Sequence, residues 1–231
     1  MEAIILAGGL GTRLQSVLKD VPKPMADIHG KPFLWYLLVL LQKGGITKVI
    51  LSVGYQQTFI KDYFQDSFLG MEIVYSCEEK LLGTGGAIRK ALAYTTEKAV
   101  MVLNGDTFFN FSIEKLYEIH TKSLSKITLG LKPMQNFDRY GSVEMTDSVV
   151  TMFEEKKFKQ YGLINAGVYL MNRDIFGIYD VSEEIFSFEK DFLEVYLSDL
   201  SPTAYLCDGY FVDIGIPEDY EKAKKEINDY I

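Results

Sequence analysis

The chain opens with the stretch MEAIILAGGLGTR (residues 1–13), followed closely by PKPM (residues 22–25). Residues 3–6 form a short apolar run that ends abruptly in glycines, which is typical of a buried parallel strand leading into a loop at the edge of a sheet. Glycine lacks a Cβ, so the loop backbone can reach positive φ and a ligand can approach its amides closely. The stretch therefore predicts a parallel α/β sheet with a ligand-binding loop after its first strand.

This first loop carries groups that suit phosphate. Successive N–H groups in a glycine-rich turn converge on an anion, and Arg13 and Lys23 add positive charge nearby. The spacing does not fit a P-loop, which needs a lysine directly after its second glycine, or the dinucleotide motif, which needs a third glycine where Leu14 stands. An ordinary strand-to-loop turn is the alternative for the glycines alone, and the two basic residues favour phosphate.

Three runs resemble a known family: LAGGLGTRL (residues 6–14), KPM (residues 23–25) and GKP (residues 30–32). They are similar to the opening of the sugar-1-phosphate nucleotidylyltransferases, enzymes that join a nucleoside triphosphate to a sugar 1-phosphate and release pyrophosphate. The resemblance recurs along nearly the whole chain. It implies a Rossmann-like three-layer α/β fold of the nucleotide-diphospho-sugar transferase type, with a small β-rich sugar-binding insertion.

The order of elements agrees with that fold class. Strands and helices alternate, which calls for a mostly parallel sheet with helices on both faces. We expect strands at residues 3–6, 48–53, 71–76, 99–103 and 127–131, and helices at residues 32–42, 57–64, 87–94 and 113–120. Later segments are predicted as a hairpin around Asp147-Ser148, a strand at 163–170, a largely helical stretch at 187–200, a strand at 203–207 and a final helix from Pro217.

Composition sets the limits. With 231 residues, 48% of them apolar, the chain can bury one large core, so we expect a single domain over residues 1–231, with residues 1–131 mainly for the nucleotide and 132–231 mainly for the sugar phosphate. A net charge of −8 argues against nucleic-acid binding. We expect a cytoplasmic protein without a membrane partner. The chain has two cysteines and no signal-peptide pattern, and its most apolar run is too short for a membrane span. Two histidines give little support to a zinc site.

A second glycine-rich segment, LGTGGA (residues 82–87), leads into a predicted helix. From its spacing alone, this segment is either a loop that receives a ligand or a helix start that needs tight packing. In the family resemblance, the segment matches the loop that holds the nucleotide base. Glu78 lies five residues before Gly83. One carboxylate can accept both adjacent N–H donors of guanine, whereas uracil or thymine offers one ring N–H between two acceptors. Glu78 therefore favours guanine, with a solvated charge as the alternative.

Two acids are candidate metal ligands. Asp106 follows a central strand, where open α/β sheets bind ligands, although a turn former is the alternative for this residue on its own. Asp213 lies within an apolar run and needs compensation if buried. The family's Asn-Gly-Asp and Asp-Ile-Gly-x-Pro signatures imply that both hold Mg²⁺, which commonly takes one or two protein carboxylates plus phosphate oxygens.

The second half supplies the expected sugar site. The run EEKK (residues 154–157) is by default a solvated face, while Asn165 sits between apolar residues in a strand and should have a hydrogen-bond partner. The resemblance implies that Lys156 meets the sugar phosphate and that Glu155 and Asn165 meet sugar hydroxyls. Gly141 and Gly167 complete the expected sugar-phosphate site.

Together, the resemblance implies the following site. The catalytic residues are Arg13, Lys23, Asp106 and Asp213. The nucleotide-binding residues are Leu6, Ala7, Gly8, Gly9, Gly11, Thr12, Glu78, Gly83, Thr84 and Gly105. A phosphate monoester has a second pKa near ~6, so the nucleophile is already ionised at neutral pH and needs no general base. Catalysis then depends on gathering anions, and we expect the loop amides, the three basic side chains and Mg²⁺ to meet at one edge of the sheet.

The resemblance is strongest to the D-glycero-D-manno-heptose 1-phosphate guanylyltransferases, which make GDP-heptose for surface polysaccharides such as capsule or lipopolysaccharide. The chain ends where longer relatives carry a β-helical domain, so we expect the catalytic domain alone. One alternative is a uridylyl- or thymidylyltransferase for a hexose 1-phosphate. Another is a non-catalytic paralogue that senses a nucleotide sugar, and a third is a sugar kinase, which would need a catalytic base and different glycine spacing. A homodimer is compatible with the sequence, which does not fix the oligomeric state.

Overall fold

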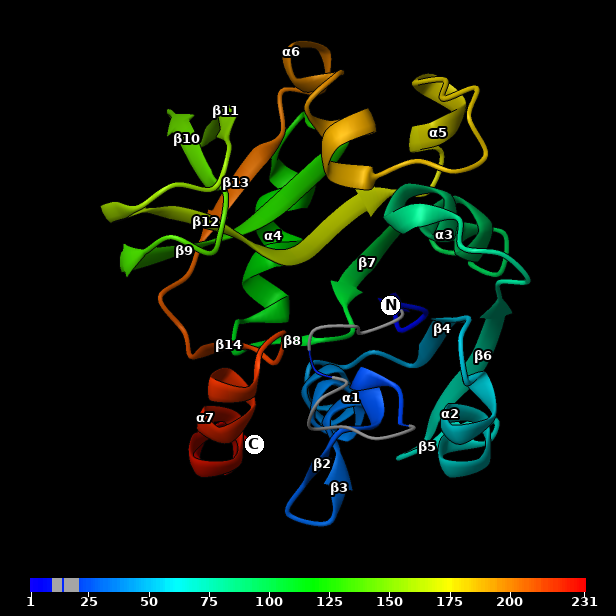
Figure 1. Ribbon diagram of the computed structural model, residues 1–231. Helices are drawn as coiled ribbons and strands as arrows, with labels where there is room; N and C mark the ends of the chain where they lie inside the picture. Colours follow the sequence, from blue (N-terminus) through cyan, green and yellow to red (C-terminus); the bar gives the residue numbers. More distant parts are fainter. Residues whose placement is uncertain (10–13, 15–20) are drawn as a thin grey trace.

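A computed structural model describes residues 1–9, 14 and 21–231. In this part of the chain, ten strands form one sheet in the order β10-β11-β13-β9-β12-β7-β1-β4-β6-β5 (Figure 1). Its parallel part consists of β7 (Ala99–Asn104), β1 (Glu2–Leu6), β4 (Lys48–Val53) and β6 (Met71–Cys77). The alternation of strands and helices in the first half of the sequence thus produces the parallel sheet that was expected.

Beyond β7 the sheet is mixed. The long strand β12 (Lys159–Asn172) runs antiparallel to both β7 and β9 (Ile127–Phe137). The predicted hairpin is confirmed as β10 (Ser142–Thr146) and β11 (Val149–Glu154), with Asp147 and Ser148 at φ 48° and 67° as a two-residue type I′ turn requires. Both hairpin strands belong to the main sheet, which β13 (Thr203–Leu206) and the edge strand β5 (Ser67–Phe68) complete.

Helices cover both faces of the sheet because successive side chains of its strands point to opposite sides. Ala3 and Ile5 of β1 belong to one buried cluster and Ile4 to the other. The helices that pack in the first cluster are α1 (Phe33–Lys43), α2 (Gln57–Phe64), α4 (Ile113–Lys122) and α7 (Pro217–Glu226). Those in the second are α3 (Gly83–Leu92), α5 (Ile175–Ile178), the short π-helix η3 (Phe188–Leu193) and α6 (Leu197–Leu200).

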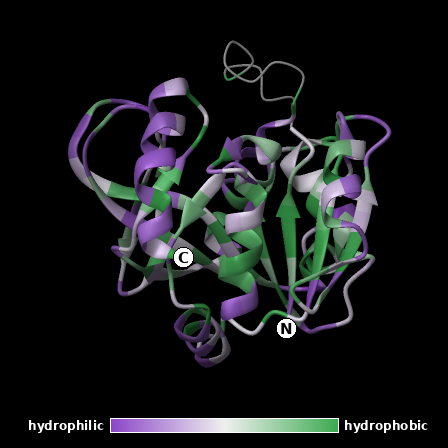
Figure 2. Ribbon diagram, turned by 90° about the horizontal axis from the view of Figure 1, so that it is seen from below, coloured by the Kyte–Doolittle hydropathy of each residue, from purple (hydrophilic) through white to green (hydrophobic). Residues whose placement is uncertain are grey.

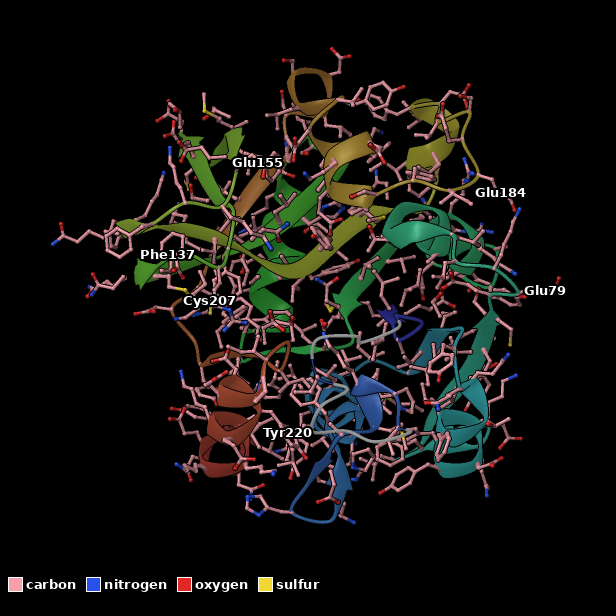
Figure 3. All side chains as sticks on the ribbon, viewed as in Figure 1. Glu79, Phe137, Glu155, Glu184, Cys207 and Tyr220 are labelled. Atoms are coloured by element: carbon pink, nitrogen blue, oxygen red, sulfur yellow. The ribbon has the colours of Figure 1, made fainter. Side chains whose placement is uncertain are left out.

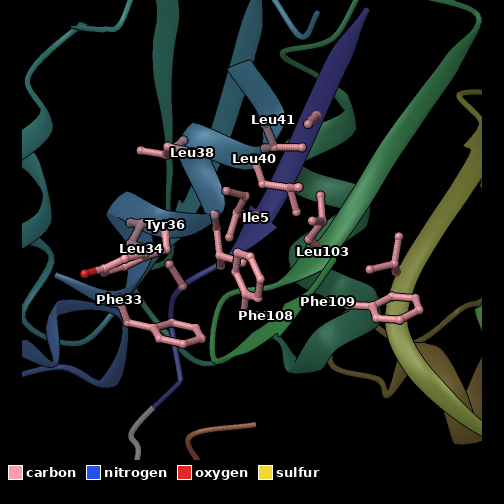
Figure 4. Packing of buried hydrophobic residues seen from close by; sticks show 14 of the residues in the cluster. Ile5, Phe33, Leu34, Tyr36, Leu38, Leu40, Leu41, Leu103, Phe108 and Phe109 are labelled. Atoms are coloured by element: carbon pink, nitrogen blue, oxygen red, sulfur yellow. The ribbon is translucent and has the colours of Figure 1, made fainter. Parts of the chain in front are cut away.

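This layering gives the three-layer architecture. Figure 4 shows Ile5 of β1 and Leu103 of β7 packed beside Leu38, Leu40 and Leu41 of α1. In Figure 2 the apolar central strands lie between helices whose outer sides are more hydrophilic. None of the helices in the described residues has the length and apolarity to span a membrane.

One helix prediction was wrong in its bounds. Helix α3 begins at Gly83 rather than at residue 87, because the glycines are part of its first turn. The stretch predicted as largely helical at 187–200 is confirmed as η3 followed by α6. The sequence pattern also did not reveal the pairing of β8 (Thr107–Phe109) with β14 (Phe211–Asp213). The remaining short elements are η2 (Lys23–Met25), β2 (Asp27–Ile28), β3 (Lys31–Pro32) and η4 (Ile227–Tyr230).

Candidate active site

A cavity of about 530 Å³ lies at the carboxyl ends of the parallel strands β1, β6 and β7. Its described lining residues are Leu6, Ala7, Gly8, Gly9, Lys23, Pro24, Glu78, Leu81, Gly83, Thr84, Ala87, Asn104 and Asp106. The structure therefore brings together most of the predicted nucleotide residues with two of the predicted catalytic ones. Gly11, Thr12 and Arg13 lie outside the described residues.

Glu78 is oriented by its neighbours. Its Oε1 accepts a hydrogen bond from Ser52 Oγ at 3.0 Å, and its Oε2 accepts one from the Leu82 amide at 3.1 Å. A Cβ on Gly8 would come within 2.8 Å of Oε1, so the glycine leaves room for the carboxylate beside the first loop. Since each oxygen can accept a second hydrogen bond, Glu78 can present two fixed acceptors to a ligand in the cavity.

The glycines of the second loop are closely packed against residue 186. A Cβ on Gly83, which has φ +70°, would lie 2.4 Å from the carbonyl oxygen of Phe186, and one on Gly85 would lie 2.1 Å from the Phe186 ring. Only Gly83 of these two lines the cavity. Gly105 is not among the lining residues, and its amide donates to the Leu6 carbonyl at 3.0 Å, so it allows β7 to approach β1.

The candidate metal ligands meet because β8 pairs with β14. Asp213 lies opposite Thr107 in that pair, and the Ile214 amide donates to the Asp106 carbonyl at 3.0 Å. Lys23 Nζ lies 3.0 Å from Asp106 Oδ2, with 11% of the lysine side chain exposed. Burial raises the pKa of Asp213, the charge of Asp106 raises that pKa further, and Lys23 opposes the shift.

A second cavity, of about 250 Å³, adjoins the hairpin. It is lined by Tyr140, Gly141, Ser142, Val143, Phe153, Glu154, Glu155, Lys156, Asn165, Glu189, Lys190 and Glu194. Four predicted sugar residues are therefore gathered here. Lys156 was expected beside Lys23 and instead lines this second cavity, because the hairpin lies on the far side of β12 from β7.

The charges of the acid pair act on one residue of the second cavity. Tyr140 lines the second cavity, and burial raises the pKa of its hydroxyl, with the charges of Asp213 and Asp106 adding to the effect. Asp106 itself lines the first cavity. Asp106 therefore lines the first cavity, while its charge and that of Asp213 also act on a side chain of the second.

The polar groups of the second cavity are already partly paired. Glu155, which Figure 3 labels, is exposed. It forms an ion pair with Lys190 at 3.1 Å, and this lowers the pKa of Glu155. Hydrogen bonds from Lys159, Ser142 and Lys157 lower the pKa of Glu154 to about 2, so it is ionised at neutral pH.

Asn165 has the partner that its position in a strand led us to expect. Its Nδ2 donates to Tyr169 Oη at 2.8 Å, and its Oδ1 accepts from the Gly167 amide at 3.0 Å. Gly167 is not a lining residue of the second cavity. It has φ +68°, and a Cβ there would lie 2.5 Å from Asn104 Nδ2, so it allows β12 to pass close to the end of β7.

Sequence reasoning missed Glu189 and Glu194 as cavity residues. Glu189 and Glu194 belong to the charge-rich stretch around η3, and nothing in that pattern separates an acid facing a cavity from one facing solvent. The packing of η3 against α3 and the contacts of Phe188 and Glu189 with Tyr169 of β12 bring this stretch to the site.

This arrangement, an open α/β sheet with a glycine loop, a lysine and two acids at the carboxyl ends of its strands, is that of a nucleotidyltransferase. Residues 2–230 match the Nucleotidyl transferase family, and the chain belongs to it. It is 50% identical over 231 residues to the D-glycero-alpha-D-manno-heptose 1-phosphate guanylyltransferase of Aneurinibacillus thermoaerophilus, covering 100% of both chains. The enzyme of the same name from Campylobacter jejuni is 52% identical over 221 residues, which are 95% of this chain and 97% of that one.

A solved structure agrees with these relatives. The crystal structure of HddC from Yersinia pseudotuberculosis complexed with GMP-PN superimposes with a TM-score of 0.85 at 38% identity, covering 97% of this chain and 98% of that one. The family and the fold class expected from the sequence are thereby confirmed.

Proposed function

We propose that this protein transfers a guanylyl group from GTP to D-glycero-alpha-D-manno-heptose 1-phosphate, giving GDP-heptose and pyrophosphate. The observation that carries the proposal is the first cavity, which brings Glu78, Lys23 and Asp106 together at the carboxyl ends of the parallel strands. A second cavity holds Lys156. The full-length similarity to two heptose 1-phosphate guanylyltransferases supports the choice of base, sugar and anomer.

In this mechanism an oxygen of the sugar phosphate attacks the α-phosphorus of GTP, and pyrophosphate leaves in line. Glu78 accepts the two N–H donors of guanine, and Lys23 and the amides after β1 hold the triphosphate. Lys156 holds the incoming phosphate, and Glu155 and Asn165 orient the sugar. No residue has to remove a proton, because the phosphate monoester is already ionised at neutral pH.

We infer that Asp106 and Asp213 hold Mg²⁺. Burial raises the pKa of Asp213, and the charge of Asp106 raises it further against the opposing charge of Lys23. A divalent cation between the two carboxylates would favour the ionised form of both. Two protein carboxylates are enough for Mg²⁺, which commonly takes its other ligands from phosphate oxygens and water. When bound, Mg²⁺ would neutralise charge that develops on the phosphates.

We further propose a cytoplasmic enzyme whose product is used for a surface polysaccharide and whose partners are small anions rather than nucleic acid or membrane. The net charge of −8 supports the exclusion of nucleic acid. A homodimer is part of the same proposal, and light scattering at several protein concentrations would test it.

The transfer reaction is tested by incubating the protein with Mg²⁺, each common nucleoside triphosphate and a panel of sugar 1-phosphates, and measuring pyrophosphate. We expect the highest rate with GTP and the heptose 1-phosphate. Asp106→Asn, which keeps the size of the side chain, should lower turnover roughly 100-fold while leaving thermal unfolding near that of the wild type. A higher rate with UTP or dTTP and a hexose 1-phosphate would replace the proposal, and no release with any pair would favour the sensing paralogue.

A further inference from the structure

One carboxylate, Glu189, connects the two cavities. It lies on η3 and lines the second cavity. Its Oε2 accepts a hydrogen bond at 2.9 Å from Oγ1 of Thr84, which lines the first cavity. Its Oε1 accepts one at 3.1 Å from the hydroxyl of Tyr169 on β12. A single side chain therefore bonds to both substrate sites.

On the sugar side, the connection continues through Tyr169 to Asn165. The Tyr169 side chain is fully buried, and its hydroxyl accepts from Asn165 Nδ2 at 2.8 Å. Burial raises the pKa of Tyr169 well above its ordinary value, and the charge of Glu189 adds to this, so the hydroxyl stays protonated and donates to Glu189. The amide of Asn165, which lines the second cavity, is therefore oriented by Glu189 through one intervening hydroxyl.

On the nucleotide side, the connection ends in the first turn of α3. Thr84 Oγ1 also accepts from the Phe188 amide at 2.8 Å, so the threonine is held by the segment that carries Glu189. That segment touches the glycines of the turn, since a Cβ on Gly83 would meet the Phe186 carbonyl at 2.4 Å. A displacement of this turn by a ligand in the first cavity must therefore move Glu189 or break its bonds.

We propose that Glu189 is a positioning residue that couples the two substrates. The nucleotide bound against Gly83 and Thr84 fixes the Glu189 carboxylate, which through Tyr169 holds Asn165 in the orientation that binds the sugar. The inference rests on the proposed function for the identity of the two ligands. It predicts that each substrate raises the affinity for the other, since coupling between sites is reciprocal.

The test measures the dissociation constant of D-glycero-alpha-D-manno-heptose 1-phosphate by calorimetry, without and with saturating α,β-methylene GTP, which cannot react at the scissile bond. In the wild type we expect the analogue to tighten sugar-phosphate binding at least about fivefold. In Glu189→Gln and Tyr169→Phe we expect a ratio below about twofold, because each change removes one acceptor or donor of the chain. Glu194→Gln is the matched control: it removes a charge from the same cavity but no bond of this chain, and should keep the wild-type ratio.

The outcomes separate the two proposals. A wild-type ratio near one, or a wild-type ratio retained in both variants, overturns the role of Glu189 even when GTP and the heptose 1-phosphate are turned over. A wild type that releases no pyrophosphate from this pair overturns the proposed function instead. Tyr169→Phe keeps the shape of a buried ring, so this variant carries the test if Glu189→Gln does not fold. If Glu189 had only a structural role, its substitution would lower thermal stability without changing the ratio.

Discussion

Replacing Glu78 by glutamine tests how the base is selected. In the wild type, Ser52 Oγ at 3.0 Å and the Leu82 amide at 3.1 Å each use one lone pair of a different carboxylate oxygen. In the proposed complex, the second lone pair of each oxygen would accept one of the two adjacent N–H donors of guanine. Glutamine turns one oxygen into an NH₂ group, which would face donors on both the protein and the base.

The expected loss follows from the hydrogen bonds that disappear. A hydrogen bond to a charged group contributes about 1.5–3 kcal/mol, and about 1.4 kcal/mol corresponds to a tenfold change in rate. Loss of one such bond to guanine should lower kcat/KM for GTP roughly 10- to 150-fold. The kcat/KM for UTP should change much less, because uracil offers a single ring N–H between two acceptors. The ratio of kcat/KM for GTP to that for UTP should therefore fall by nearly as much as kcat/KM for GTP does.

The assay is pyrophosphate release with GTP and UTP at subsaturating concentrations, with thermal unfolding recorded for each variant. Glu79→Gln is the control, since it makes the same change of charge at the adjacent position, whose exposed side chain lies at the edge of the molecule (Figure 3). If Glu78→Gln folds normally and keeps the wild-type preference, the carboxylate does not select the base.

Three further substitutions follow from the structure. Asp213→Asn should raise Tm at pH 7 without Mg²⁺, because the raised pKa of Asp213 makes its ionised carboxylate unfavourable in the folded state. The gain in Tm should vanish as the pH falls below about 3.9, where this acid is protonated in both the folded and the unfolded state. Calorimetry at several pH values would measure it. Gly85→Ala should cost about 1–3 kcal/mol in chemical unfolding, since the added methyl meets the Phe186 ring, whereas Gly177→Ala has no described atom within 4 Å of the new methyl and should cost nothing. Ser112→Ala removes the hydroxyl that accepts from the Lys115 amide at the start of α4, and should cost about 1 kcal/mol with pyrophosphate release unchanged.

Much of the fold could be predicted because local signals coincide with it. The apolar run before Gly8, and those of the next three parallel strands, each end at turn residues, so both strand type and strand ends are visible in the sequence. The turn at Asp147 and Ser148 was predicted because two residues between alternating runs leave few other geometries. The extent of antiparallel pairing beyond β7 was less visible, since the partner of a strand depends on tertiary packing.

The site was predictable to the degree that each residue follows its own strand. Lys23, Asp106 and Glu78 all lie near the carboxyl ends of parallel strands, which meet at one edge of any such sheet. Glu189 does not follow a strand of the sheet, and it reaches the site through contacts that are distant in sequence, with Thr84 of α3 and Tyr169 of β12. Its role depends on a contact between residues about a hundred positions apart, which no local pattern encodes.

The acid pair explains how a chain with a net charge of −8 can bring two further anions together. Lys23 is only 11% exposed, so its charge is less screened than that of a surface lysine and acts strongly on what lies beside it. Asp106 takes up part of that charge in an ion pair at 3.0 Å. A cation on the two carboxylates would compete for Asp106 and leave Lys23 available to phosphate. Metal and nucleotide should therefore bind interdependently, since each supplies the charge that makes the other's position favourable.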